Sequence, residues 1–312
     1  MPMRFSVQLP TAADGPSWLD KVKRAEDLGF DSVSVPDHLG PALPQLAPFV
    51  ALAAASAVTT RIRLATTVID NDFRHPVMLA KEVATLDVLS SGRVDLGIGA
   101  GWAPEDYSRT GIATFDSAGE RVARLIESLD VVRRLLAGEE VTHTGANYQL
   151  DRYRSNPDPV QQPVPVMIGA GGRRMLTMAA QQADIISLIV QLGDTADRRR
   201  AAFEQQLRWI DEAGGRDRDD LTIGVRIFFG EIGAAGTSRR TVAERVASVH
   251  GMEIADVLAS PFGLVGDPVA ARDHLQEVHE RYGINYFTLN EDLAWNAGPI
   301  LADLASTGGQ ER

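Results

Sequence analysis

Three short clusters in the chain hold side chains whose types suit catalysis or ligand binding. The first is Asp37-His38, which follows the predicted strand Phe30–Val35 after Pro36. A histidine just beyond a strand can act as an acid or base near neutral pH, and an adjacent carboxylate supports its charged form. The alternative is a loop histidine without a role. His38 is therefore a candidate catalytic residue.

The second cluster is Gly99-Ala100-Gly101-Trp102, which follows the predicted strand Arg93–Ile98 and forms, with Gly97, a series of three alternate glycines. Glycines allow a backbone to approach a flat ligand closely. The spacing is not the G-x-G-x-x-G of dinucleotide-binding proteins, so a structural tight turn explains the same residues equally well. Trp102 can form the wall beside a bound ring or lie in the core.

The third cluster, Gly169-Ala170-Gly171-Gly172, leads into a predicted helix that begins with Arg173 and Arg174. Free N–H groups at a helix start, with guanidinium groups nearby, favour phosphate binding. The alternative is a turn followed by two solvated arginines. Phosphate binding is favoured because strand, glycine loop and helix follow in the required order.

The elements that must position these clusters are apolar runs that alternate with helical segments. We expect strands over Arg4–Leu9, Phe30–Val35, Ile62–Ile69, Arg93–Ile98, Val164–Ile168, Asp184–Ile189, Leu221–Phe229 and Ile284–Leu289. The pattern is α/β and predicts a (β/α)8 barrel, whose sites lie at the carboxyl ends of the strands. A doubly wound sheet is the alternative.

Two segments between these elements depart from the regular alternation. Residues 138–164 are expected to form an insertion between the fourth and fifth strands, with a hairpin over 141–150. The segment Trp102–Thr114 is expected to be a loop. Further along, Ser17 is a plausible N-cap for the first helix, and a helix in two pieces is expected over 241–260.

Composition limits the classes of function that the chain can have. Its 312 residues are 44% hydrophobic without a linker, so we expect a single domain over 1–312. A net charge of −11 argues against nucleic acid as a partner. There is no cysteine, and no spacing typical of metal or serine chemistry. With no signal peptide and no run long enough to cross a membrane, we expect a cytoplasmic protein.

Taken in order, several stretches resemble the luciferase-like monooxygenase family, a group of flavin- and F420-dependent (β/α)8 barrels. These stretches are Ala25–Asp31, Val35–His38, Arg74–Pro76, Ala84–Arg93 and Leu96–Trp102. Within the family the sequence is most similar to the F420-dependent oxidoreductases. The resemblance implies a homodimer that binds a small-molecule substrate.

The resemblance also implies roles for the first cluster and for one strand end. His38 corresponds to the histidine beside the reactive carbon of the deazaflavin, and Asp37 to a neighbour that contacts the cofactor. Thr67 and Val68 are unremarkable strand residues by themselves. In the family they correspond to a non-proline cis peptide that forms a bulge behind the ring.

The two glycine clusters correspond to further parts of the cofactor site. Gly99–Gly101 match the turn beneath the ring, and Gly169–Arg173 match the turn that holds the phosphate. One position departs from the family's sugar-phosphate dehydrogenase, where an acidic residue follows the first of these turns. Here that position is Trp102, and the nearest acids are Glu105 and Asp106.

The function expected from the sequence is that of an F420-dependent oxidoreductase. A hydride would pass between C5 of the deazaflavin and a small organic substrate, while His38 gives or takes the proton and Asp37 orients His38. A reduced-FMN monooxygenase on the same barrel, or a catalytically silent flavin- or F420-binding protein, is the alternative. Sequence separates the first two of these poorly, and the presence of both Asp37 and His38 argues against the silent binding protein.

Overall fold

The computed structural model of the chain describes residues 1–40, 45–190, 195–214 and 216–307. By their internal contacts the residues form two compact units, which we describe separately as unit 1 and unit 2. Unit 1 comprises Met1–Gln8, Ala25–Asp31 and Ala170–Arg312, and unit 2 comprises Leu9–Arg24 and Ser32–Gly169. The expectation of a single domain over 1–312 stays a prediction.

Within the described residues, eight parallel strands follow the order of a closed (β/α)8 barrel, which confirms the predicted fold class and rules out the doubly wound sheet. They are β1 Arg4–Gln8, β2 Ser32–Val35, β3 Arg63–Thr66, β5 Val94–Gly99, β8 Val166–Ala170, β9 Ile185–Leu188, β10 Thr222–Ile227 and β13 Tyr286–Asn290. Each predicted strand is present, and most are shorter than expected.

Unit 2 contains β2, β3, β5 and β8 as neighbouring parallel strands. The predicted third strand is divided into two pieces, and the peptide bond between Thr67 and Val68 is cis, as the family resemblance implies. Beyond that bond the short strand β4 Ile69–Asp70 pairs with the end of β5. The 3-10 turn Asn71–Phe73 then leads into the next helix.

The helices of unit 2 begin at residues suited to that position. They are α2 Pro48–Ser56, α3 Pro76–Ser90, α4 Pro104–Thr110 and α5 Ala118–Leu136. His75 caps α3, accepting a hydrogen bond from the N–H of Val77, and Pro76 occupies a position where its missing N–H costs nothing. Ser117 and Glu120 form a reciprocal capping box at the start of α5.

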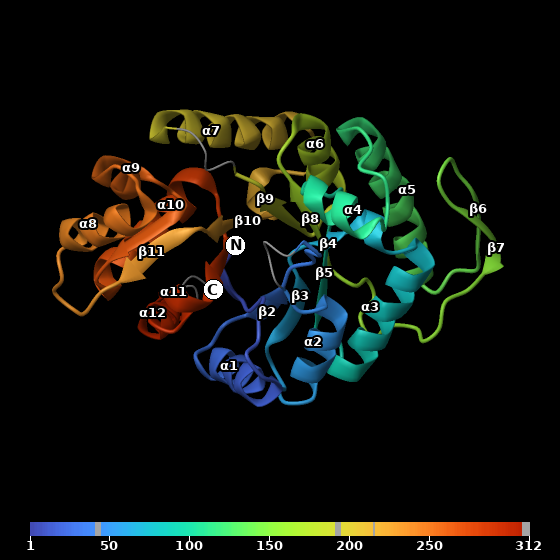
Figure 1. The fold of residues 1–312 in the computed structure, drawn as a ribbon, viewed down its shortest axis with the longest axis horizontal. Coiled ribbons are helices and arrows are strands. Elements are labelled where there is room, and N and C mark those ends of the chain that lie inside the picture. The colour runs from blue at the N-terminus through green and yellow to red at the C-terminus, as the bar shows by residue number, and fades with distance from the viewer. Residues whose placement is uncertain (41–44, 191–194, 215, 308–312) are drawn as a thin grey trace. The chain divides into compact units, whose positions relative to one another are not determined.

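The expected insertion is present as the antiparallel hairpin of β6 Val141–Thr144 and β7 Gln149–Tyr153, which extends outward from α5 in unit 2 (Figure 1). Two other expectations for the N-terminal half are wrong. Helix α1 spans Gly15–Asp27 and is capped by Asp14 rather than Ser17, since the Asp14 carboxylate accepts from the N–H of Ser17. The segment 102–114 is not all loop, because it contains α4.

Unit 1 contains β9, β10, β13 and β1 as neighbouring parallel strands. Its helices are α6 Arg173–Gln182, α7 Ala196–Glu212, α8 Arg239–His250, α9 Ile254–Ala259, α10 Pro268–Tyr282, α11 Glu291–Ala294 and α12 Gly298–Thr307. A 3-10 turn over Arg218–Asp220 precedes β10. The helix expected in two pieces over 241–260 is confirmed as α8 and α9.

A second insertion, which the sequence analysis missed, lies between β10 and α10. Its strands β11 Phe229–Ile232 and β12 Gly263–Gly266 pair in parallel and pack with α8 and α9 (Figure 1). A separate apolar cluster that includes Phe229, Val246 and Val257 fills the space between them. The strand expected over Leu221–Phe229 therefore ends at Ile227, and Phe229 belongs to β11.

Over the described part of the chain, no helix is long and apolar enough to cross a membrane.

Candidate active site

His38 lies just beyond the end of β2 and is held by a buried carboxylate from α4. Its Nδ1 atom lies 2.6 Å from Oδ2 of Asp106, whose side chain is almost completely buried. A carboxylate accepts hydrogen bonds, so Nδ1 of the histidine carries the donated proton. In the neutral ring Nε2 is then the basic nitrogen, and this leaves it available to take or give a proton.

The backbone that follows His38 also holds the Asp106 carboxylate in place. The other oxygen of Asp106 accepts the backbone N–H groups of Leu39 at 3.1 Å and Gly40 at 2.5 Å. A Cβ atom at Gly40 would lie 2.8 Å from that oxygen, so a larger residue would disturb the contact. The turn after β2 and the helix α4 therefore support a single orientation of the imidazole.

Asp37 does not orient His38, which corrects the expectation from the sequence. Its carboxylate contacts the guanidinium of Arg74 at 2.5 and 3.2 Å and accepts the N–H of Asp70 at 3.2 Å. Successive side chains of extended backbone point to opposite sides, so adjacent residues at the end of β2 meet different neighbours. Arg74 also contacts Glu82 at 3.2 Å.

Trp102 lies beside the histidine and is open to solvent. The indole ring is edge-on to the imidazole of His38, with the ring centroids 5.2 Å apart and an angle of 86° between the planes. The residue is 63% exposed, so it is not a core tryptophan. An exposed aromatic surface next to a candidate acid or base suits the packing of an organic ligand.

Val68, which follows the cis bond, is flanked by two of the predicted glycines. A Cβ at Gly99 would lie 2.9 Å from Val68 Cγ2, and one at Gly169 would lie 3.1 Å from the same atom. At Gly97 a Cβ would lie 1.9 Å from the carbonyl oxygen of Thr66. The valine side chain thus occupies space that is free only because glycines line the ends of β5 and β8.

Gly101 packs against a buried pair made by β4 and α4. The hydroxyl of Tyr107 donates to the Asp70 carboxylate, at 2.9 and 2.8 Å from its two oxygens. Burial raises the pKa of Asp70 to about 6, although the Asp72 N–H and the Tyr107 hydroxyl oppose that rise. Gly101 has φ +74°, and a Cβ there would lie 2.1 Å from the Tyr107 oxygen. Only glycine fits this turn.

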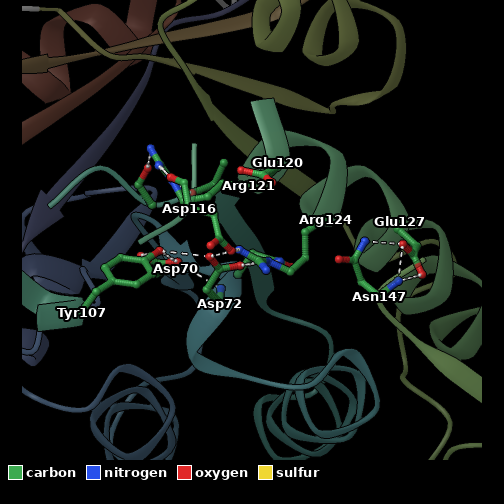
Figure 2. A network of polar contacts seen from close by, with 12 residues as sticks. Asp70, Asp72, Tyr107, Asp116, Glu120, Arg121, Arg124, Glu127 and Asn147 are labelled. Carbon is green, nitrogen blue, oxygen red and sulfur yellow. Dashed lines mark hydrogen bonds and ion pairs between the residues drawn. The ribbon is translucent and has the colours of Figure 1, made fainter. Parts of the chain in front are cut away.

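Arg121 and Arg124 of α5 take part in a polar network with Asp72 and Asp116 (Figure 2). Arg124 binds both oxygens of Asp72 at 2.8 and 3.0 Å and reaches Asp116 at 2.8 Å. Arg121 donates to the carbonyl oxygen of Ala100 at 3.1 Å. The bond from Arg121 therefore holds the backbone of the second cluster in place.

The described residues contain no group of three or more side chains placed to bind a metal ion.

The third cluster forms the end of β8 and the start of α6. Gly172 is the N-cap of α6 and, having no side chain, makes no capping bond of its own. Gly171 is held by Gln206, whose amide nitrogen donates to its carbonyl oxygen at 3.0 Å. Arg173 is exposed and pairs with Glu212 at 3.1 Å.

Sequence reasoning missed four residues that shape this site: Arg74, Asp70, Asp106 and Tyr107. Asp106 and Tyr107 are consecutive on α4, and each binds a different strand end. A signal for α4 is visible in the sequence, since Pro104 suits the first helical turn and Gly111 suits the end. No local signal identifies Asp70 as a buried acid.

Comparison with known proteins places the chain in a broad family. Residues 1–244 match the family model described as luciferase-like monooxygenase. A relative from Microbacterium testaceum, named F420-dependent glucose-6-phosphate dehydrogenase, is 36% identical over 232 residues. The match covers 71% of this chain and 66% of the relative, so the chain spans just under two thirds of that relative's length.

Solved structures share the fold at low sequence identity. An F420-dependent tetrahydromethanopterin reductase from Methanopyrus kandleri has a TM-score of 0.77 at 20% identity and covers 97% of this chain and 99% of its own. A monooxygenase from Streptomyces bottropensis has a TM-score of 0.76 at 22% identity, with 98% and 99% covered. At these identities the likeness shows the barrel alone.

Proposed function

Because the chain belongs to the luciferase-like monooxygenase family, we propose that it is a coenzyme F420-dependent oxidoreductase. In this proposal a hydride passes between C5 of the deazaflavin and a small organic substrate. The relative named F420-dependent glucose-6-phosphate dehydrogenase, 36% identical over 232 residues, supports F420 as the cofactor. Its sugar phosphate is not carried over, since Trp102 stands at the position of an expected acidic residue.

The observation that carries the proposal is the contact between His38 and Asp106, 2.6 Å long. A hydride transfer to or from a carbonyl or alcohol needs a proton at the oxygen. The bound deazaflavin supplies or accepts only the hydride. His38 supplies or takes the proton at Nε2, while Asp106 holds Nδ1–H and stabilises the charged ring. Asp106 is thus a positioning residue.

The residues present fit a flat ring with an anionic tail. Val68 lies between Gly99 and Gly169, where a Cβ at either glycine would come within 3.1 Å of the valine methyl. We propose that Thr67, Val68 and the run Gly99–Trp102 contact the ring. The run Gly169–Arg173 would bind the tail phosphate, since a glycine turn that leads into a helix start favours an anion.

Asp37 and Trp102 take different parts in this proposal. Asp37 contacts the cofactor in this proposal, and its carboxylate also fixes the guanidinium of Arg74 at 2.5 Å. Trp102 is exposed and edge-on to His38, which suits a wall for the substrate. Both assignments rest on the contacts that these side chains make with the residues around His38.

We further propose a homodimer in the cytoplasm. Exposed apolar side chains on the neighbouring helices α2 and α3 support the dimer: Val50, Met78, Val88 and Leu89. Isolated apolar residues are common on protein surfaces, but several on adjacent helices suit an interface. Sedimentation of the purified protein measures its oligomeric state directly, and a monomer at micromolar concentration would contradict the homodimer.

The cofactor is tested by titrating the purified protein with F420 and, separately, with FMN, while following the fluorescence of each. We expect tight binding of F420 and weak binding of FMN. Tight FMN binding without F420 binding would favour the monooxygenase. For a silent binding protein, F420 would bind but not be reduced or oxidised with any member of a panel of alcohols, aldehydes and ketones.

The role of His38 is tested with His38→Ala and Asp106→Asn. His38→Ala removes the proton donor and lowers turnover by at least about a hundredfold. Asp106→Asn lowers kcat by about a hundredfold, because an amide favours a hydrogen on Nε2 instead of Nδ1. F420 affinity stays within about threefold in both variants, since neither change removes a glycine or helix-start contact.

Two matched substitutions serve as controls. His250→Ala removes an exposed histidine of α8, and Glu105→Gln changes the exposed acid next to Asp106 on α4. Both should keep the turnover of the parent protein. Equal turnover by His38→Ala and His250→Ala would remove His38 from the mechanism, and equal turnover by Asp106→Asn and Glu105→Gln would do the same for Asp106.

A further inference from the structure

One face of the neighbouring strands β1, β13 and β10 in unit 1 carries several polar side chains. In the parallel register Ser6 pairs with Thr288, Gln8 with Asn290, and Arg226 with Thr288. Side chains alternate along a strand, so these residues share one face of β1, β13 and β10. The alternate face is apolar and holds Phe5, Val7, Val225, Ile227, Phe287 and Leu289, all buried.

Arg226 is a partly buried cation on this polar face, and its protein partners, the amide of Asn290 and the ring of Phe228 at 5.4 Å, are neutral. Its Nε and Nη2 atoms donate to Oδ1 of Asn290, at 3.1 and 2.9 Å. Asn290 is fixed in turn, since its amide nitrogen donates to the carbonyl oxygen of Phe228 at 3.3 Å. Residues Ser6 and Thr288, on the same face, carry no charge.

Within residues 1–40, 45–190, 195–214 and 216–307, no carboxylate pairs with Arg226. Burial lowers the pKa of Arg226, because desolvation disfavours its charged form. A cation shielded from water without a counter-charge is costly to the folded state. A structural role is served better by an apolar residue, so the guanidinium needs another explanation.

The hydrogen bonds to Asn290 use only one edge of the guanidinium. The Nε edge points to Asn290 Oδ1, while the described residues offer no acceptor to Nη1. The Nη1–Nη2 edge therefore keeps two parallel N–H groups, the arrangement that binds two oxygens of a carboxylate or phosphate. Asn290 fixes the plane of the guanidinium and so reduces the entropy lost on binding.

We propose that Arg226, held by Asn290, is an anion-binding subsite that receives a carboxylate or phosphate group of the substrate. The inference deepens the proposed function, on which it rests, by naming the substrate class: small molecules with an anionic group. The fold supports this assignment, since Arg226 lies near the carboxyl end of a barrel strand, where substrates of such barrels bind.

The test is a calorimetric titration of the cofactor-free protein with inorganic phosphate at constant ionic strength. The parent protein should bind phosphate, and Arg226→Gln should lose at least about tenfold in affinity, as expected for a charge-assisted pair. Arg226→Lys should fall between the two, because a lysine keeps the charge but not the paired N–H groups. Arg173→Gln, which alters the other candidate phosphate turn, should retain this binding event.

A second titration, in saturating F420, assigns the anion to the substrate or to the cofactor. Phosphate binding that remains in saturating F420 and is lost in Arg226→Gln supports the substrate assignment, and complete loss of phosphate binding in saturating F420 would overturn it. Equal phosphate affinity in Arg226→Gln and the parent protein, or no phosphate binding at all, would overturn the subsite. Neither result affects F420 binding itself, so failure of this inference is distinct from failure of the proposed function.

Thermal unfolding shows whether the Arg226→Gln variant is still folded. Because Arg226→Gln removes an unpaired charge, its unfolding midpoint should equal or exceed that of the parent protein. Arg245→Gln is the matched control, since this exposed arginine of α8 pairs with Glu231 and lies outside the polar face. A midpoint well below that of the control would indicate a structural arginine and contradict the subsite.

Discussion

The charged groups of unit 2 differ sharply from Arg226 in unit 1. In unit 2 the buried carboxylates have cationic or N–H partners: Asp37 holds Arg74, Asp72 holds Arg124, and Asp95 holds Arg63. Arg226 has a neutral amide as its partner. A paired charge supports the chain itself, whereas an unpaired one is better explained by a ligand.

The comparison also separates two kinds of carboxylate within unit 2. Asp37 and Asp72 bind arginines, and their loss should cost stability. Asp106 binds a histidine and two backbone N–H groups, so its loss should cost turnover as well. Stability measurements on single substitutions test whether this division holds.

The largest effect on stability is expected for Asp37→Asn. The change leaves the partly buried Arg74 without its main counter-charge and should lower the free energy of unfolding by about 3–5 kcal/mol. Unfolding in urea measures it. Asp158→Asn is the control, because Asp158 pairs with Arg154 in solvent and such pairs contribute less than about 1 kcal/mol. Similar losses in both variants would erase the contrast between buried and exposed pairs.

The next effect is a pH dependence that comes from Asp70. Its pKa rises from 3.8 to about 6 on burial, so between these values the folded state holds a proton that the unfolded state has released. The stability contributed by Asp70 is therefore present at low pH and lost as the pH rises through about 6. The loss is about 3 kcal/mol in total.

Asp70→Asn should remove this slope, and unfolding in urea at several pH values from 4 to 7 measures it. We expect the stability difference between the parent protein and the variant to shift against the parent protein as the pH rises. Asp267 contributes a pH dependence of stability with the opposite sign. The N–H groups of Ala270 and Gly236 lower its pKa, so the stability that it contributes is lost as the pH falls. Parallel curves for the parent protein and Asp70→Asn would show that Asp70 does not titrate in this range.

The fold could be predicted because its signals are local. Apolar runs, proline starts and glycine ends mark the barrel strands and most helices, and barrel topology then places His38 and Gly99 at strand ends. The strand over Leu221–Phe229 was predicted too long, because apolar residues continue from β10 into β11. Periodicity alone does not show where one buried strand ends and another begins.

The pairing of charges could not be predicted, because it depends on distant residues. His38 and Asp106 are 68 residues apart, and the sequence offered the adjacent Asp37 instead. Extended backbone directs Asp37 to Arg74, a preference that appears only once the strand faces are known. The same limit applies to Arg226, whose strand was predicted but whose polar face required the register with β13.

The smallest effect on stability is expected for Arg173→Gln. Arg173 and Glu212 are 3.1 Å apart but both are more than half exposed, so the pair contributes about 0.5 kcal/mol or less to the free energy of unfolding. Its proposed role is to bind the tail phosphate at the start of α6, and there the change should weaken F420 binding about tenfold. Fluorescence titration and urea unfolding of the same preparation separate the two effects. A large loss of stability with unchanged F420 affinity would mean that Arg173, like Asp37, serves the chain rather than a ligand.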